Sequence, residues 1–368
     1  MEAAKLNIAI VGCGKIADGH AEEIKNLPAA NLAAACDIEP IMAEQLAARY
    51  RIPRHYSDLE TMLANEHIDV LHVTTPPASH LPITLNAVAA GCHVLVEKPL
   101  APTAEQAHRL ITAVEEAGKK LTVNYWPNFE QQSVALREHV IRGDLGDIVH
   151  LESYLGYNLA GAFGQALLSD PEHWVHRLPG KLFQNNLDHV LNKIVPLLPE
   201  GPTSVHAEAF RRRKDLRNDA TDCVLDELRV LIRSGDATAY ATFCAHAKPV
   251  GHFVRVYGTR ATVDADFNMR TLVFEAEQTM PSALGRLFPP FRRGFAYLRQ
   301  AGHNVREFGG SRFGFFAGMN RLFSLFYDSV LQDAPLPISY SEMLRVSELM
   351  DEIIQQVYPT VSGRSVLR

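Results

Sequence analysis

The sequence predicts an α/β domain with a doubly wound parallel sheet over residues 1–125, followed by an α+β domain with a large, mostly antiparallel open sheet over residues 126–368. In the first part, short apolar runs alternate with helix-compatible segments, which is typical of a parallel sheet covered by helices. In the second part, strand-like runs follow one another with few helices between them. The chain of 368 residues is also longer than one hydrophobic core usually serves.

The overall composition narrows the class of protein. Hydrophobic residues make up 47% and charged residues 21% of the chain, as in ordinary globular proteins. The formal net charge of −6 argues against a general nucleic-acid-binding protein, and no apolar run is long enough to cross a bilayer. The five cysteines are scattered without a CxxC pair, and no signal-peptide pattern precedes the first apolar run. We therefore expect a cytoplasmic protein without a bound metal.

The first strand is predicted at residues 6–11, an apolar run that leads into a GxGxxA turn. Gly12 permits a tight turn after the strand, and Gly14 lets the backbone approach a pyrophosphate at the N-terminus of the next helix. Ala17 lets that helix pack closely on the strand. The motif alone is weak evidence for a dinucleotide site, so the segments that follow have to support it.

A second apolar strand, at residues 32–36, ends at Asp37. Asp37 follows Gly14 at close to the spacing expected of a carboxylate that binds the ribose diol of an adenosine. Its charge would repel a 2′-phosphate, and the next two residues supply no arginine, so the sequence favours NAD over NADP. The alternative is that Asp37 caps a helix that begins before Pro40.

The alternation of strands and helices continues to about residue 125. Apolar runs at residues 69–74 and 93–96 read as parallel strands, and residues 57–60 and 103–106 look like capping boxes that begin helices. Two glycines stand where helices would end, namely Gly91 and Gly118. In a sheet of this kind, ligands bind at the carboxyl ends of the strands.

Three segments of this first domain carry recognisable motifs. They are the glycine turn at residues 12–17, Thr75-Pro76-Pro-Ala-Ser-His80, and Ala90-Gly-Cys-His-Val-Leu-Val-Glu97-Lys98-Pro99. In this order and spacing they resemble the signatures of the glucose-fructose oxidoreductase / inositol dehydrogenase / MocA-like (Gfo/Idh/MocA) family, and the Glu-Lys-Pro sequence is the most specific of them. The resemblance is strong over residues 6–125, fair over residues 126–275 and weak over about 280–335.

The resemblance implies a Rossmann domain followed by a substrate-binding domain whose sheet often forms the interface of a homodimer or homotetramer. It implies an NAD(H)-dependent oxidoreductase that transfers hydride to or from a carbinol carbon of a sugar, cyclitol or nucleotide-sugar. The alternatives are a C=C or C=N reductase of the same family and a catalytically silent dinucleotide-binding sensor. The predicted cofactor-binding residues are Gly12, Gly14, Lys15, Ile16, Asp37, Thr75, Pro76, His80, Glu97 and Lys98.

Lys98 is the residue that the resemblance places beside the reacting carbon. Removing hydride from a carbinol carbon requires the hydroxyl proton to leave as well. A partly desolvated lysine at a strand end can hydrogen-bond that oxygen and offset its developing negative charge. The alternative is an exposed lysine at the end of a strand. Pro99 predicts either a cis peptide bond or a rigid turn after Lys98.

The family often carries an aspartate and, four residues later on the same helix, a histidine. This chain has Asn185 and His189 at these positions, on one helical face. An asparagine cannot accept a proton, so Asn185 is expected only to orient a substrate hydroxyl. The predicted catalytic residues are therefore Lys98, His189 and Asn185. The alternative for His189 is a histidine buried in packing between the domains.

The second domain is predicted mainly from strand-like runs. A helix is expected at residues 131–142, and residues 254–263 resemble a hairpin with a glycine turn that is typical of the family. Helical periodicity also recurs at residues 320–330 and 339–357. The strands are predicted at residues 148–157, 204–213, 225–233, 237–245, 252–257 and 271–276.

Residues 281–321 form a basic, aromatic segment inside an acidic protein. Seven arginines stand there against the single acid Glu307, with phenylalanines and leucines between them. Three interpretations remain open. The segment could form helices that cover the sheet or an oligomer contact, it could grip a phosphorylated substrate, or it could lie as an amphipathic face on a membrane.

Overall fold

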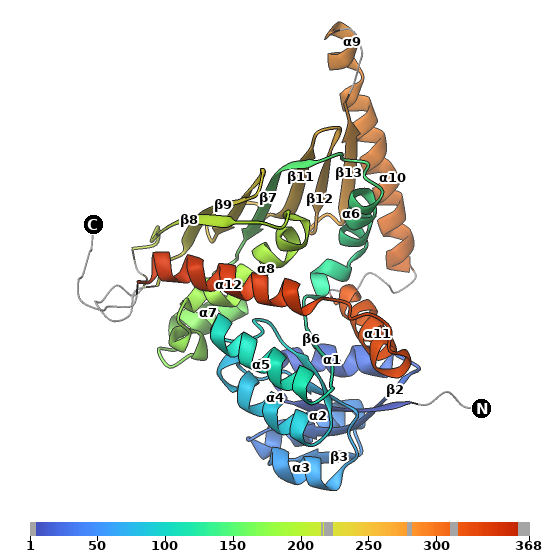
Figure 1. The fold of residues 1–368 in the computed structure, drawn as a ribbon, viewed down its shortest axis with the longest axis vertical. Coiled ribbons are helices and arrows are strands. Elements are labelled where there is room, and N and C mark those ends of the chain that lie inside the picture. Colours follow the sequence, from blue (N-terminus) through green and yellow to red (C-terminus); the bar gives the residue numbers. More distant parts are fainter. Residues whose placement is uncertain (1–4, 215, 217–223, 278–281, 310–315, 360–368) are drawn as a thin grey trace. The chain divides into compact units, whose positions relative to one another are not determined.

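A computed structural model of the chain describes residues 5–214, 216, 224–277, 282–309 and 316–359. The chain divides into two compact units (Figure 1). Unit 1 contains residues 1–129 and 316–348, and unit 2 contains residues 130–315 and 349–368.

Unit 1 is built on a six-stranded sheet in which every neighbouring pair is parallel, in the order β3-β2-β1-β4-β5-β6. The strands are β1 (Leu6–Val11), β2 (Ala30–Cys36), β3 (Arg54–Tyr56), β4 (Val70–Val73), β5 (His93–Val96) and β6 (Leu121–Val123). The order reverses between β1 and β4, which is where doubly wound sheets bind their ligands. The parallel sheet that the sequence predicted is therefore confirmed.

Helices cover this sheet. They are α1 (Lys15–Lys25), α2 (Pro40–Tyr50), α3 (Leu59–Asn65), α4 (His80–Ala89) and α5 (Ala104–Glu116), with short 3₁₀ turns η1 (Pro77–Ser79) and η2 (Trp126–Phe129). The Thr103 cap of α5 is confirmed, since its hydroxyl accepts the N–H of Gln106 at 3.2 Å. The cap predicted at Ser57 is wrong by one residue, because the carboxylate of Asp58 accepts the N–H of Thr61 at 2.8 Å.

One helix of unit 1 comes from far along the chain. Helix α11 (Ala317–Gln332) packs against α1 and η2, and its buried side consists of Met319, Leu322, Phe323, Phe326 and Tyr327. This differs from the continuous second domain predicted for residues 126–368. The physical reason is the apolar stripe of α11, which is buried within unit 1.

Unit 2 is built on a seven-stranded sheet in the order β13-β12-β11-β7-β10-β9-β8. The strands are β7 (Ile148–Gly156), β8 (Thr203–Phe210), β9 (Glu227–Ser234), β10 (Ala237–Cys244), β11 (His252–Gly258), β12 (Ala261–Asp266) and β13 (Thr271–Ala276). Only the pair β7–β10 is parallel among these, so the mostly antiparallel sheet is confirmed, together with the β11–β12 hairpin.

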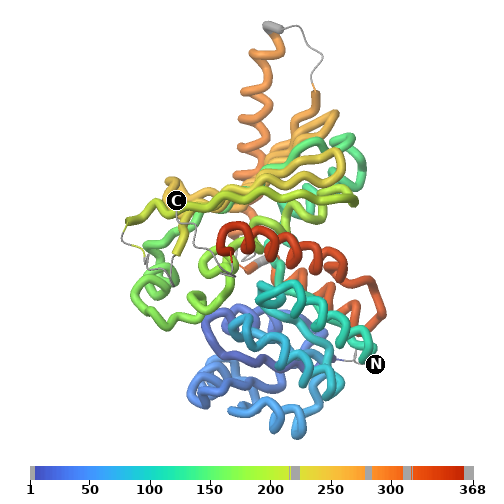
Figure 2. Tube along the Cα trace, turned by 60° about the vertical axis from the view of Figure 1, so that its left-hand side comes forward, coloured from blue at the N-terminus to red at the C-terminus, as the bar shows by residue number. Residues whose placement is uncertain are grey.

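The helices of unit 2 lie on one face and at one edge of this sheet. They are α6 (Gln131–Ile141), α7 (Ala162–Ser169), α8 (Lys181–Ile194), α9 (Ser282–Leu287) and α10 (Pro289–Gly309), with 3₁₀ turns η3 (Trp174–Arg177) and η4 (Val195–Leu197). Helix α8 packs against β7 and β10, and α10 runs along the edge strand β13 (Figures 1 and 2). Helix α12 (Tyr340–Val357) begins in unit 1 and ends in unit 2. Its predicted cap is confirmed, since the hydroxyl of Ser339 accepts the N–H of Glu342 at 3.2 Å.

Candidate active site

The glycine turn between β1 and α1 places two glycines in different surroundings. Gly12 has φ +91°, and a Cβ atom there would lie 2.6 Å from Cγ2 of Thr75, so only glycine lets the loops after β1 and β4 approach each other. A Cβ atom on Gly14 would meet nothing within 4 Å. Gly14 is also the N-cap of α1, where no side chain makes a capping hydrogen bond. The first turn of α1 therefore offers backbone N–H groups beside open space, as a bound pyrophosphate requires.

Asp37, directly after β2, is fixed to this turn. Its Oδ2 accepts the N–H of Cys13 at 2.6 Å, and its Oδ1 accepts the N–H of Glu39 at 2.9 Å. The N-cap of α2 is Glu39, so the alternative that Asp37 caps this helix is wrong. Each oxygen of a carboxylate accepts more than one hydrogen bond, which leaves Asp37 able to bind a ribose diol.

The loop after β4 carries Thr75, Pro76 and His80. Pro76 is exposed and Thr75 is half-buried, whereas His80 is fully buried. Nε2 of His80 lies 2.9 Å from the carbonyl oxygen of Thr75, and Nδ1 lies 3.1 Å from that of Pro99. Burial lowers the pKa of His80, which favours the neutral ring. A neutral ring has one N–H, so the buried His80 ring lies between the loops after β4 and β5 and donates to one of these two carbonyl oxygens.

Glu97, at the end of β5, anchors a chain of buried hydrogen bonds. Its Oε1 lies 2.9 Å from Nε2 of His20 and accepts the amide of Asn124 at 2.6 Å. Nδ1 of His20 lies 2.8 Å from Nδ1 of His72, and the hydroxyl of Tyr327 lies 2.9 Å from Nε2 of His72. These side chains come from α1, β4, β5, α11 and the end of β6, and all are buried.

The protonation states in this chain follow from its geometry. Burial, reinforced by His20, holds the pKa of His72 well below its ordinary value, so His72 carries one ring proton. Burial would raise the pKa of Glu97, but the hydrogen bond and charge of His20 outweigh it, and the pKa is lowered. When His20 is neutral, the hydroxyl of Tyr327 donates to His72, His72 donates to His20, and His20 donates to Glu97. When His20 is protonated, it donates to both Glu97 and His72, and His72 then donates to Tyr327. Glu97 is an acceptor in both states.

Lys98 is held directly by this arrangement. The second oxygen of Glu97, Oε2, accepts the backbone N–H of Lys98 at 3.1 Å. The peptide bond between Lys98 and Pro99 is cis, one of the two geometries that the sequence predicted. The Lys98 side chain is half-buried at the carboxyl end of β5, on the same edge of the sheet as the glycine turn and Asp37.

In unit 2, α8 carries the two other predicted catalytic residues. Asn185 is buried and His189 is half-buried, one helical turn apart on a shared face. The start of α8 packs closely on Ile354, because a Cβ atom on Gly180 would lie 2.5 Å from Cδ1 of Ile354 and this side chain would have to shift. The hydroxyl of Ser153 on β7 donates to the carbonyl of Val190 at 2.8 Å and ties the helix to the sheet.

A buried lysine, Lys193, lies on α8, one turn after His189. Nζ of Lys193 donates to the backbone carbonyl of His189 and lies 5.0 Å from the centre of the Phe267 ring. Burial lowers the pKa of Lys193 to about 7, against the opposing effect of neighbouring carboxylates. The half-buried His252 also faces Lys193, and desolvation together with this charge lowers the pKa of His252 well below the ordinary value.

Sequence reasoning missed His20, His72, Tyr327 and Lys193. The signal for His20 was its position on the apolar face of the predicted helix, next to Ala21. The signal for His72 was its place inside a fully buried strand. Within the ranges that the structure describes, no three His, Cys, Asp or Glu side chains gather as metal ligands would, and no helix is long and apolar enough to span a bilayer.

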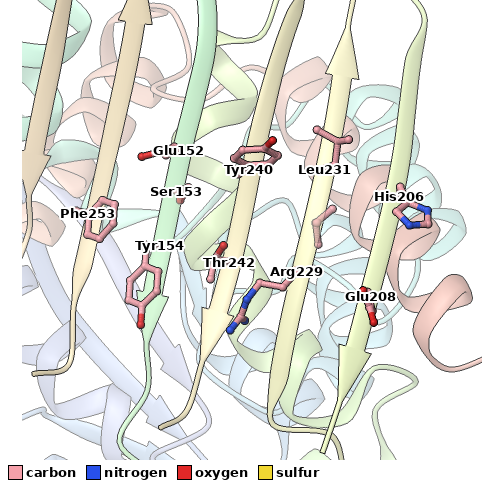
Figure 3. A pocket seen from close by; sticks show the side chains of 11 residues that line it. Glu152, Ser153, Tyr154, His206, Glu208, Arg229, Leu231, Tyr240, Thr242 and Phe253 are labelled. Atoms are coloured by element: carbon pink, nitrogen blue, oxygen red, sulfur yellow. The ribbon is translucent and has the colours of Figure 1, made fainter. Parts of the chain in front are cut away.

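The face of the seven-stranded sheet away from α8 is open within the described part of unit 2. Alternate residues of β7, β9 and β10 point outward there and line a shallow depression (Figure 3). The floor of the depression contains both charged and aromatic side chains. Arg229 and Tyr240 are exposed there, and Glu152 and Tyr154 are half-buried. A half-polar outer face is usual for antiparallel sheets.

Comparison with known proteins shows which family residues 6–125 resemble. Residues 6–125 match the model of the GFO_IDH_MocA family, described as an oxidoreductase family with an NAD-binding Rossmann fold. The chain is 36% identical to D-glucoside 3-dehydrogenase of Escherichia coli (strain K12) over 149 residues, which is 40% of this chain and 42% of that protein. It is 30% identical to inositol 2-dehydrogenase of Arthrobacter sp. (strain FB24) over 150 residues, or 40% and 44% of the two chains. These alignments span less than half of each relative.

Solved structures extend the likeness of fold to the whole chain. The WlbA dehydrogenase from Bordetella pertussis, in complex with NADH and UDP-GlcNAcA, has a TM-score of 0.75 at 19% identity and covers 97% of this chain and 96% of its own. An oxidoreductase from Agrobacterium radiobacter, in complex with NAD+, L-tartaric acid and magnesium, has a TM-score of 0.76 at 16% identity and covers 97% of both chains. At these identities the likeness concerns the fold alone. Residues 6–125 of this chain are therefore similar to the NAD-binding Rossmann domain of the Gfo/Idh/MocA oxidoreductase family.

Proposed function

We propose that this protein is an NAD(H)-dependent oxidoreductase that transfers hydride to or from a carbinol carbon of a sugar, cyclitol or nucleotide-sugar. The observation that carries the proposal is the convergence of the glycine turn, Asp37 and Lys98 on one edge of the parallel sheet. The names of the related proteins, a glucoside dehydrogenase and an inositol dehydrogenase, support this substrate class.

The residues of the turn fit a dinucleotide. The open space at Gly14 and the uncapped start of α1 suit its pyrophosphate, and the fixed carboxylate of Asp37 suits the ribose diol. Lys15, Ile16, Thr75 and Pro76 would line the same site. When bound, NAD accepts or supplies the hydride. Asp37 favours NAD over NADP, because its charge opposes a 2′-phosphate.

Side chains of this protein would bind the reacting oxygen and transfer the hydroxyl proton. Lys98 would hydrogen-bond the reacting oxygen and offset the negative charge that develops there. The carboxylate of Glu97, held by His20 and Asn124, keeps the backbone of Lys98 in place. His189 would accept or return the hydroxyl proton, and Asn185 would orient a neighbouring hydroxyl without taking a proton.

The proposal is tested first by titrating NAD, NADH, NADP and NADPH into the purified protein. We expect NAD(H) to bind at least about tenfold more tightly than NADP(H), because a tenfold difference in Kd corresponds to the free energy of one good polar contact. This preference should be lost in Asp37→Ala. The exposed Asp236 in unit 2 supplies the matched control, Asp236→Ala. Failure of every dinucleotide to bind would overturn the proposal.

A second test is turnover with sugars, cyclitols and nucleotide-sugars. Turnover supports the assigned reaction. Tight NAD(H) binding without turnover would favour the silent sensor, which the asparagine at position 185 makes the strongest alternative, and turnover only of C=C or C=N substrates would favour the reductase.

We also propose a homodimer or homotetramer formed through the open face of the seven-stranded sheet. Tyr240 is 50% exposed on this face, and Leu231 is 41% exposed. Introducing charge with Tyr240→Asp should lower the mass measured by light scattering, whereas Ile141→Asp, on the exposed end of α6, should not.

We also propose a cytoplasmic location. The thiols of Cys13, Cys36 and Cys92 are free and buried, and burial raises the pKa of each, which agrees with a reducing compartment.

A further inference from the structure

Helix α10 turns its polar side toward its own sheet. The guanidinium of Arg293 pairs with the carboxylate of Glu275 on β13. The side-chain amide of Gln300 bonds both backbone groups of Leu272. The amide of Asn304 donates to the carbonyl of Met269 at 2.9 Å. Residues 293, 300 and 304 recur at the spacing of one helical face, so polar contacts hold α10 against β13.

The opposite side of α10 is apolar and exposed. No residue of this helix is buried. A stripe on the side away from the polar contacts contains Phe291, Phe295, Leu298 and Val305, which are 61%, 70%, 70% and 72% exposed. Helices of globular proteins normally turn such a stripe inward, and exposed apolar patches of this kind mark interaction sites. The interpretation of this segment as a cover for the sheet is therefore incomplete.

A row of arginines borders the apolar stripe. Arg292, Arg299 and Arg306 recur every seven residues on one flank, and Arg286 precedes them on α9. Residues 282–309 contain five arginines and one acid, Glu307, in a chain whose net charge is −6. The stripe therefore lies on a basic part of the chain, which an anionic surface would attract.

From this geometry we infer that α10 docks on the surface of an anionic lipid bilayer. The apolar stripe enters the boundary between head groups and acyl chains, and the flanking arginines pair with lipid phosphates. The polar side remains bonded to β13, so the helix lies on the membrane and does not cross it. This inference is independent of the proposed reaction.

Two other occupants fit less well. In a two-fold pairing with a second copy, the arginine rows of both chains would be brought together, which repels. A single phosphorylated substrate is too small, because Arg292 and Arg306 are 14 residues apart on one helix, or about 21 Å. The surface of an anionic bilayer is extended, so its phosphate groups can pair with all the arginines of the row at once.

The test is co-sedimentation of the full-length protein with sucrose-loaded vesicles. Vesicles of phosphatidylcholine with about 30% phosphatidylglycerol are compared with pure phosphatidylcholine, at low salt and at about 0.5 M salt, where charge interactions are screened. We expect the protein to pellet with anionic vesicles at low salt, much less at high salt, and little with neutral vesicles.

Two sets of variants assign the binding to α10. Phe291→Gln with Phe295→Gln and Leu298→Gln should abolish pelleting without affecting folding, since all three side chains are exposed. Arg292→Gln with Arg299→Gln and Arg306→Gln should weaken anionic binding on the order of 100-fold, at about fivefold per cation. Ile141→Gln, at an apolar residue 83% exposed on α6, is the matched control and should bind normally.

Two outcomes would overturn the inference. One is the absence of protein in the pellet with anionic vesicles at low salt. The other is a concentration-dependent association of the protein alone, seen by sedimentation velocity and removed by the same apolar substitutions, which would assign the face to a second copy. Normal folding of each variant is checked by circular dichroism, so that a loss of binding reports on the surface.

Discussion

The hydroxyl of Tyr327 lies 2.9 Å from Nε2 of His72, although 255 residues separate them in the sequence. Through His72 and His20 this contact continues to Glu97, whose carboxylate holds the backbone of Lys98. A residue of α11 is thereby connected to the edge of the sheet where the proposed chemistry takes place.

Replacement of Tyr327 by phenylalanine is expected to destabilise the protein by about 1–3 kcal/mol. The substitution keeps the ring and leaves a buried polar nitrogen of His72 without its partner. Urea denaturation measures the change in the free energy of unfolding. Tyr297→Phe, at a tyrosine that is 40% exposed on α10, is the control and should leave stability unchanged. Equal stability of the Tyr327 and Tyr297 variants would show that the bond to His72 contributes nothing.

The two glycines of the turn should respond differently to alanine. Gly14→Ala meets no neighbouring atom and keeps an allowed φ of −72°, so its stability should match wild type. Its methyl group should nevertheless weaken NADH binding about tenfold or more, because it occupies the approach of the pyrophosphate. Gly12→Ala should lose at least about 1 kcal/mol of stability, since φ is +91° and the methyl group collides with Thr75. Thermal unfolding and NADH titration of both variants separate these effects, and tight NADH binding by Gly14→Ala would contradict the placement of the pyrophosphate.

Lys98→Met should lower kcat/KM by about 10²- to 10⁴-fold on whichever substrate is turned over. The reason is that the lysine acts on charge that develops at the reacting oxygen, so most of the loss should be in kcat. Steady-state kinetics with the same substrate provide the measurement. The exposed Lys5 offers a control, and Lys5→Met should retain full activity. An unchanged kcat in Lys98→Met would remove this residue from the catalytic set.

Lys193 should make stability depend on pH. Its pKa is about 7 in the folded chain, and an unfolded lysine keeps its proton to about 10.5. Between these values the unfolded state binds the extra proton, so the stability from this group rises with pH and falls as pH decreases toward 7. The difference between Lys193→Met and wild type should change by roughly 1.4 kcal/mol per pH unit in this window. Urea unfolding at pH 7.5 and 9.5 measures it, with Lys5→Met expected to follow wild type. Parallel curves for all three proteins would argue against a buried neutral lysine.

Most of unit 1 could be predicted because each apolar run is bounded by a local signal. Gly91 and Gly118 take positive φ at the ends of α4 and α5, as expected of glycines after helices. Cys13, Cys36 and Cys92, which lie in or beside such runs, are buried. The wrong cap at Ser57 arose because serine and aspartate are both good caps and stand next to each other.

The buried chain from Tyr327 to Glu97 could not be predicted in the same way. A histidine on a helix or strand is compatible with solvent, with a ligand or with a buried partner. His72 acquires its role only through a tyrosine on α11, and no local pattern connects the two. The basic segment shows a similar limit, because its periodicity predicts an amphipathic helix but not which side of α10 faces the sheet.

The dependence of unit 1 on α11 has a consequence for how the protein is made. A ribosome that has released the six strands of the parallel sheet must still synthesise nearly two hundred residues before the helix that covers His72 and His20 exists. Until then, the two imidazoles and the apolar surface that receives Phe323 lack their partner, and closing so long a loop is slow. Unit 1 therefore lacks one of its packed helices when the chain is cut at residue 129. Its completion requires translation to the end of α11, at residue 332.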